Sequence, residues 1–227
     1  MSDTTHFDLQ TELTRLPFYM DLTPQECELL SASADVRTFD KGTVLHDRST
    51  ECLGLVRVLS GRTRTTMTSP DGREVTIYSL GPGDDDVLTA TCVVSQITFD
   101  SAMVADERTQ ALVVPAPTLR RLRDENVYVR CWLYELSTRR FSDAMWTMQQ
   151  ILFMRADQRV ASGLLDEYAR TGTVRLAVTQ DQLARSISSA REVVSRVLKR
   201  MEADGLLRVG RGCIELVDLD GLYRVIG

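Results

Sequence analysis

Short apolar segments with alternating polar positions dominate the first half of the chain. Residues 62–67 alternate in the way expected of a half-buried strand, and similar segments follow at close spacing. Ser69-Pro70-Asp71-Gly72 separates two of them as a turn, because proline presets one φ and glycine accepts a positive one. The pattern predicts a sandwich or barrel-like β domain, whose expected strands include residues 43–46, 52–61, 62–67, 74–80, 102–105 and 110–114.

A helical pattern replaces the strand pattern from about Thr118. Between Asn126 and Met154 there is no glycine or proline, and apolar residues recur at positions 129, 133, 136, 144, 148 and 151. These steps predict a long helix with one apolar stripe. At ~1.5 Å per residue it would be roughly 40 Å long, more than one small domain needs to cover its own core. We interpret it as a dimerisation helix, with simple packing on the β domain as the alternative.

Two helix-start signals lie close together in the last third of the chain. Thr179 and Gln182 form a capping box that opens a short helix over residues 180–187. Ser189 and Glu192 form a second box, which opens a helix over residues 190–205. Two capped helices separated by roughly three residues predict a helix-turn-helix. The buried stripe of the second helix is expected to contain Val194, Val197, Leu198 and Met201, and Gly205 is expected to cap its C-terminus.

The opposite face of the second helix carries groups that can read bases. Arginine can donate two hydrogen bonds to guanine O6 and N7, and glutamate can accept from cytosine N4. A solvated charged face, with Glu192 serving only its capping box, is the alternative interpretation. The preceding capped helix and the local charge favour DNA reading. The residues concerned are Arg191, Glu192, Ser195 and Arg196.

The net charge of −5 speaks against a chain coated in basic surface, but the charge is unevenly distributed. Residues 155–227 contain 12 basic and 10 acidic residues, whereas residues 1–154 contain 15 and 22. Residues 185–211 contain seven basic and three acidic residues. The local positive charge therefore coincides with the predicted helix-turn-helix, as expected of a nucleic-acid-binding domain.

A β-hairpin is predicted directly after this motif. Residues 206–209 and 213–217 are apolar-rich, and Gly210-Arg211-Gly212 joins them. Arg211 at the tip could contact a phosphate, which positions a protein on DNA without reading its sequence. A helix-turn-helix followed by a hairpin is a winged helix.

Residues 190–222 resemble the C-terminal end of the CRP/FNR family of transcription regulators. That family has a recognition helix reading R-E-x-V-x-R and a closing D-x-x-x-L, and both patterns occur here. Residues 16–30 resemble the N-terminal lead-in of the family, and residues 54–84 resemble its β-roll. The resemblance therefore covers nearly the whole chain.

The resemblance implies an α+β fold with three parts. Residues 1–117 are expected to form a β-roll sensor domain, a cyclic-nucleotide-binding-like jelly roll. Residues 118–154 would form the connecting and dimerisation helix, and residues 155–227 a winged helix-turn-helix DNA-binding domain. The implied partners are double-stranded DNA with a pseudo-palindromic site, a second copy of the chain, and RNA polymerase. The residues expected to contact DNA are Thr179, Gln180, Ser189, Arg191, Glu192, Ser195, Arg196 and Arg211.

The effector is left unassigned, because the chain departs from the family pattern there. Members that bind cyclic AMP carry Gly-Glu after the Pro-Gly turn and Arg-Ser about ten residues later. Here Asp84-Asp85-Asp86 follows that turn, and no arginine occurs between Arg73 and Arg108. Three neighbouring carboxylates disfavour an anion, so cyclic AMP is not expected to bind.

Other cofactors are weighed by the ligands that they need. An iron–sulfur cluster needs four thiolates, and members of the family that contain one hold it through a group of N-terminal cysteines. Here only Cys27 precedes residue 50, so the resemblance does not imply such a cluster. Haem stays open because some members of the family ligate it through the β-roll, and His46, Cys52, Cys92 or a methionine could serve as ligands. A small-molecule effector is the remaining alternative. A thiol switch at Cys52, Cys92 or Cys131 also stays open, although free cysteine is usually a small buried apolar residue. No metal site is predicted.

No motif of an enzyme is present. The chain lacks the phosphate-binding loop, the dinucleotide fingerprint, the H-E-x-x-H zinc motif and the nucleophile elbow. We expect a cytoplasmic protein from three features of the sequence. Its five cysteines form no C-x-x-C pair, it has no signal peptide, and it has no long apolar run. We therefore expect a transcription regulator controlled by an effector or redox signal in the β-roll. The alternative is an effector-binding module, or a haem or thiol sensor, whose main output is not DNA binding.

Overall fold

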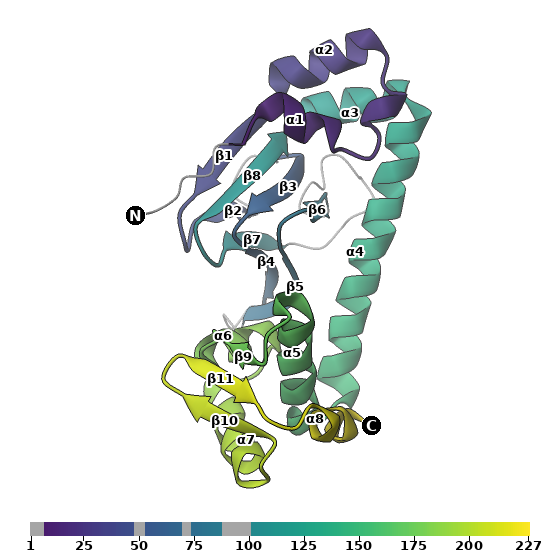
Figure 1. Cartoon of the computed structure of the whole chain (residues 1–227). Helices are drawn as coiled ribbons and strands as arrows, with labels where there is room; N and C mark the ends of the chain where they lie inside the picture. The colour runs from purple at the N-terminus through teal and green to yellow at the C-terminus, as the bar shows by residue number, and fades with distance from the viewer. Residues whose placement is uncertain (1–6, 48–52, 70–73, 88–100) are drawn as a thin grey trace. The chain divides into compact units, whose positions relative to one another are not determined.

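The computed structural model describes residues 7–47, 53–69, 74–87 and 101–227 (Figure 1). The chain divides into two compact units. One contains Met1–Gly72 and Ile77–Ala144, and the other contains Arg73–Thr76 and Met145–Gly227. Among the described residues, no helix combines the length and the apolar composition that crossing a membrane requires.

Two four-stranded sheets form the β domain of the first unit. Their strand orders are β1-β8-β3-β6 and β2-β7-β4-β5. Val58 and Ala111 of the first sheet and Leu45 and Met103 of the second belong to one buried apolar cluster, so the sheets share a core. This confirms the predicted sandwich-like β domain. The strands are β1 (Asp35–Phe39), β2 (Val44–His46), β3 (Leu55–Ser60), β4 (Thr63–Thr68), β5 (Glu74–Leu80), β6 (Asp85–Asp86), β7 (Ala102–Ala105) and β8 (Thr109–Val114).

The strand predictions match the structure where alternation was clear. The strands over 74–80 and 102–105 have the predicted bounds. The strand predicted over 52–61 is shorter, because Gly54 adopts a φ of +93° and β3 begins only at Leu55. The predicted turn at 69–72 lies mostly outside the described residues.

Helices gather at one end of the β domain (Figure 1). Their apolar faces pack with β3 and β8 in a second buried cluster, which includes Phe18, Leu30, Leu112 and Leu119. Burying a side chain of this kind contributes roughly 1.5–3 kcal/mol. The helical elements are α1 (Leu9–Thr14), the 3-10 turn η1 (Tyr19–Asp21), α2 (Pro24–Ser33), α3 (Ala116–Glu125) and α4 (Val127–Phe153).

Asn126 separates α3 from α4. Its backbone is extended, which ends α3, and its Oδ1 accepts from the amide of Tyr128 at 2.9 Å, which caps α4. Its Nδ2 donates to the carbonyl of Asp21 at 3.0 Å and to Glu26 Oε2 at 3.1 Å. The pKa of Glu26 is lowered, because hydrogen bonds from Thr23 and Asn126 outweigh the effect of desolvation by burial.

The long helix was predicted correctly, but its single apolar stripe was not. Val129, Trp132, Leu133 and Leu136 are buried in the core of the first unit. A different face of α4 is apolar and exposed along the whole helix. We call this face the exposed α4 row, and it contains Val127, Cys131, Tyr134, Thr138, Phe141, Met145, Met148 and Leu152.

The second unit is a helical domain with a small antiparallel sheet of order β10-β11-β9. Val160, Leu164, Leu183, Leu198 and Ile214 form part of its buried core. Its elements are α5 (Ala156–Thr171), β9 (Arg175–Leu176), α6 (Gln180–Ser186), α7 (Arg191–Ala203), β10 (Leu207–Gly210), β11 (Cys213–Leu216) and α8 (Leu219–Ile226).

Candidate nucleic-acid interface

The first helix of the predicted motif begins as the sequence indicated. Thr179 Oγ1 accepts from the amide of Gln182 at 3.2 Å, and Gln182 Oε1 accepts from the amide of Thr179 at 2.8 Å. This capping box opens α6, which the four residues 187–190 separate from α7. Thr179 is exposed and Gln180 is half-buried at the start of α6.

The second predicted capping box is wrong. Ala190 occupies the N-cap position of α7, and its methyl side chain makes no capping hydrogen bond. Ser188 adopts a φ of +51°, and the amide of Ser189 donates to the carbonyl of Ala184 at 2.9 Å, so Ser189 ends the turn after α6. Glu192 is therefore not used for capping, and its exposed carboxylate has no hydrogen-bond partner among the described residues.

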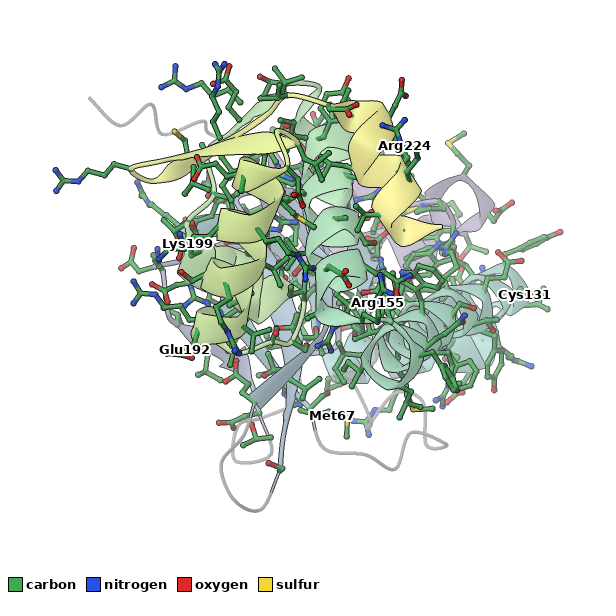
Figure 2. The ribbon with its side chains drawn as sticks, turned by 90° about the horizontal axis from the view of Figure 1, so that it is seen from below. Met67, Cys131, Arg155, Glu192, Lys199 and Arg224 are labelled. Atoms are coloured by element: carbon green, nitrogen blue, oxygen red, sulfur yellow. The ribbon has the colours of Figure 1, made fainter. Side chains whose placement is uncertain are left out.

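Helix α7 has one buried face and one polar face. Its buried residues are those predicted: Val194, Val197, Leu198 and Met201. Glu192, Arg196 and Lys199 are exposed and Ser195 is half-buried on the opposite side. The side chains of Glu192 and Lys199 extend away from the body of the domain (Figure 2). This is the arrangement that a recognition helix needs to reach base edges in a major groove.

Two details of this face were not predicted. Arg191 lies at its edge, where Nε is 3.4 Å from Asp181 Oδ1 in an ion pair with α6. Lys199 belongs to the same face as Ser195 and Arg196, from which it is separated by four and three residues. That spacing is the signal that could have added Lys199 to the predicted set.

The predicted wing is present. β10 and β11 pair antiparallel, with Gly210 opposite Cys213 at the closed end. Arg211 is exposed in the turn, and Gly212 adopts a φ of +74°, which favours glycine. The third strand, β9, was not predicted because it has only two residues.

The candidate haem ligands are not brought together by the described structure. His46 is buried on β2, and its Nδ1 has no hydrogen-bond partner among the residues that the structure describes. Cys52 and Cys92 lie outside the described residues. Within the described ranges, no group of three or more His, Cys, Asp or Glu side chains is placed to hold a metal ion.

The acidic run of the β domain is engaged within the first unit. Asp84 Oδ2 accepts from the amide of Gly81 at 2.9 Å, and Asp86 Oδ1 accepts from the hydroxyl of Tyr78 at 3.1 Å. Burial, followed by the negative charge of Asp86, raises the pKa of Tyr78 well above its usual value. Arg140 on α4 donates through Nε to the carbonyl of Asp85 at 2.9 Å. Its ion pair with Asp143 spans 2.7 Å.

These contacts determine whether the acidic run could accept the phosphate of a cyclic nucleotide. The described residues of this region offer buried carboxylates, and Arg140 is already engaged by acceptors of the same chain. A phosphate beside these carboxylates would meet like charge. The described residues of the acidic run therefore do not fit the usual anionic ligand.

Two family models match the chain. Residues 158–225 match a Crp-like helix-turn-helix domain, and residues 36–126 match a cyclic nucleotide-binding domain. The first match covers α6, α7 and the wing, and the second covers most of the β domain and α3.

The relatives that match over most of the chain are named as a cyclic AMP receptor protein or as transcriptional regulators. The Cyclic AMP receptor protein of Thermus thermophilus is 28% identical over 201 residues, which cover 88% of this chain and 92% of the relative. The transcriptional regulator SdrP of the same organism is 29% identical over 173 residues, with coverages of 73% and 80%. A crystal structure described as a transcriptional regulator of the CRP/FNR family from Eubacterium rectale has 33% identity and a TM-score of 0.86, covering 94% of this chain and 99% of that one. The chain therefore belongs to the CRP/FNR family of transcription regulators, with a helix-turn-helix DNA-binding domain and a cyclic-nucleotide-binding-like sensory domain.

Proposed function

We propose that this protein is a homodimeric, sequence-specific transcription regulator in which α7 reads base edges in the major groove. The observation that carries the proposal is the polar face of α7, where base-reading side chains stand exposed opposite a buried apolar stripe. Arg191 and Arg196 would donate to guanines, and Glu192 would accept from a cytosine. Ser195 is a further base contact on the same face.

The remaining predicted contacts would be to the DNA backbone. Thr179 and Gln180 lie at the start of α6, Ser189 lies in the turn before α7, and Arg211 lies at the tip of the wing. Hydroxyl, amide and guanidinium groups at such positions fix the register of a protein on the duplex. Replacing any one of them should weaken binding to all sequences alike.

The exposed α4 row supports a dimer. Its residues repeat in steps of four and three, which is the spacing of core positions in a two-stranded coiled coil. Phe141 is 60% exposed and Leu152 is 63% exposed, so large apolar surfaces along α4 have no partner within the described chain. A second copy of α4 would cover them, and two α7 helices would then enter major grooves about 34 Å apart on a pseudo-palindrome.

This arrangement assigns a different role to each of the three parts of the chain. Residues 1–117 would sense the signal, residues 118–154 would transmit it through α4, and residues 155–227 would bind DNA. A change in the β domain would alter the dimer helix and thereby the spacing of the two reading heads. Such a regulator acts on the chromosome together with RNA polymerase, which makes the cytoplasm its expected location.

Selection of binding sites from random duplexes tests the proposal. The wild type should select a two-fold symmetric site, and Arg196→Ala should lose preference at one base-pair position of each half-site, at a cost of ~1–3 kcal/mol. Arg175→Ala, which removes an exposed arginine on β9, is the control and should keep the preference. If Arg196→Ala weakens all sequences equally, Arg196 contacts phosphate instead. If the wild type selects no sequence, the alternative of a sensor with an output other than DNA binding is favoured.

A further inference from the structure

A hollow of about 570 Å³ lies between the first turn of α5 and the recognition helix α7. Its polar wall consists of three arginines and one carboxylate, namely Arg155, Arg196, Arg200 and Asp157. None of these residues except Arg196 belongs to the predicted set of DNA contacts. The hollow is therefore a feature that base reading by α7 does not explain.

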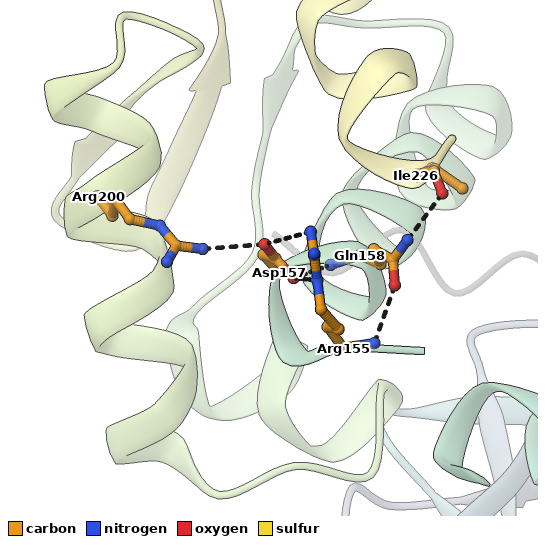
Figure 3. A network of polar contacts seen from close by, with 5 residues as sticks. All are labelled: Arg155, Asp157, Gln158, Arg200 and Ile226. Atoms are coloured by element: carbon orange, nitrogen blue, oxygen red, sulfur yellow. Dashed lines mark hydrogen bonds and ion pairs between the residues drawn. The ribbon is translucent and has the colours of Figure 1, made fainter. Parts of the chain in front are cut away.

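Asp157 holds two of these arginines in place (Figure 3). Arg200 on α7 donates through Nη2 to Asp157 Oδ2 at 3.0 Å, and Arg155 donates through Nη2 to the same oxygen at 3.1 Å. Arg155 Nε and the amide of Gln158 donate to Oδ1 at 3.2 and 3.1 Å. Burial raises the pKa of Asp157, but these hydrogen bonds and the charges of the two arginines lower it further, so the carboxylate is ionised at neutral pH.

The hollow retains an excess of positive charge. Three guanidinium groups face one carboxylate, and the N-terminal end of the 16-residue helix α5 adds the positive end of its dipole. The side chains of Arg155 and Arg200 are 72% and 61% exposed, so both can present further N–H donors to an outside ligand while they stay paired with Asp157. Arg196 is exposed and has no hydrogen-bond or ion-pair partner among the described residues.

The hollow is continuous with the reading face of α7. Arg196 belongs to both, and Arg200 follows it by four residues, one turn further along the same side of the helix. When a helix lies in a major groove, the sugar-phosphate strands that border the groove run along its flanks. A duplex whose bases contact Arg196 therefore carries its sugar-phosphate backbone past this hollow.

We propose that the hollow is a phosphate clamp, in which Arg155 and Arg200 bind the backbone of the duplex that α7 reads. This inference rests on the proposed function, because the same DNA must lie on α7. Guanidinium groups suit the task, since their planar forks match phosphate oxygens. The clamp contributes affinity and register, but it reads no base.

The salt dependence of DNA binding tests the clamp. Fluorescence anisotropy would follow binding of a selected duplex and a shuffled duplex over a series of KCl concentrations. Each phosphate contact contributes about 0.9 to the slope of log K against log salt, so a dimer lacking one contact per subunit loses about 1.8. We expect this loss for Arg155→Ala and for Arg200→Ala, on both duplexes.

Arg224→Ala is the matched control. Arg224 is also an exposed arginine of the second unit, paired with Asp218 at 3.2 Å on α8, and it does not line the hollow. Its removal deletes the same charge and one Arg–Asp ion pair, and it should leave the slope unchanged. Slopes of Arg155→Ala and Arg200→Ala that match the slope of Arg224→Ala would overturn the clamp, as would a loss confined to the selected duplex.

Failure of the clamp and failure of the proposed function give different results. If α7 reads no sequence, the wild type binds both duplexes equally, and Arg196→Ala has the same effect on both. The slopes of Arg155→Ala and Arg200→Ala can still be measured on the shuffled duplex in that case. If the clamp alone is wrong, sequence preference and the Arg196→Ala effect persist while those slopes stay at the wild-type value.

Discussion

Arg57 on β3 and Asp85 on β6 are directly paired across two antiparallel strands, and Arg57 Nε lies 3.6 Å from Asp85 Oδ1. Both side chains are largely shielded from solvent. Burial raises the pKa of Asp85 from 3.8 to about 6, because the positive charges of Arg57 and Arg140 offset only part of the desolvation. The first unit therefore contains a carboxyl that destabilises the fold when it ionises.

This pKa predicts a pH dependence of stability with a definite sign. Between pH 3.8 and about 6 the folded protein binds the Asp85 proton more tightly than the unfolded chain does. The contribution of Asp85 is therefore largest at low pH and is lost as pH rises through about 6, by up to about 3 kcal/mol. Asp85→Asn should remove this dependence.

Urea unfolding at a series of pH values checks this prediction. A Trp146→Phe background leaves Trp132, which packs against Phe18 with ring centroids 4.9 Å apart, as the reporter of the first unit. Asp84→Asn should keep most of the pH dependence, with its midpoint moved to slightly lower pH, because Asp85 stays buried and the charge of Asp84 is only a minor cause of its raised pKa. Equal pH dependence in the wild type and Asp85→Asn would contradict the account.

Gly54 should tolerate no side chain. It adopts a φ of +93°, and a Cβ would lie 2.6 Å from the amide nitrogen of Ala116 and also too close to the carbonyl of Val114. We expect Gly54→Ala to lower the free energy of unfolding by more than ~2 kcal/mol, since backbone atoms must move. Gly42 has a similar φ of +86°, but a Cβ there would meet no atom of the described residues within 4 Å, so Gly42→Ala should cost only the conformational strain of ~1–2 kcal/mol. Thermal melts of both variants should differ in this order, and equal melting temperatures would contradict it.

Cys131 can report the register of the proposed dimer. It belongs to the exposed α4 row, and core positions of a parallel two-stranded coiled coil face their own copies. A short bismaleimide should therefore link two chains through Cys131 and give a covalent dimer on a denaturing gel. Cys131→Ser should abolish the product, and Phe141→Glu should reduce it strongly by placing charge in the row. If the wild type gives no cross-linked dimer that is lost in Cys131→Ser, this register is excluded.

Sequence patterns predicted helices and strands correctly where each side chain either packs into one core or makes one local hydrogen bond. The strands over 74–80 and 102–105 alternate between a core and an outer face, and the Thr179–Gln182 capping box needs only neighbouring residues. The prediction of a single apolar stripe on α4 was wrong, because the apolar residues of this helix lie on two faces, one buried and one exposed. Leu133 packs into the core of the first unit, whereas Phe141 is exposed.

Only the part of the candidate site that depends on local sequence spacing could be predicted. The face of α7 follows from helical spacing, but the N-cap of α7 was predicted at Ser189 and lies at Ala190, because the positive φ of Ser188 could not be foreseen. The Asp157–Arg200 contact joins residues 43 positions apart. Only the packing of α5 beside α7 brings them together, so no local pattern could have indicated the hollow.

The most direct test of the account is a hydroxyl-radical footprint of the wild-type protein on its selected duplex. A dimer with two reading heads should protect two patches, separated by one helical turn of about 34 Å and related by two-fold symmetry. Phe141→Glu should lose the paired pattern because it disrupts the exposed α4 row. A single protected patch, or a paired pattern that Phe141→Glu leaves intact, would contradict the account.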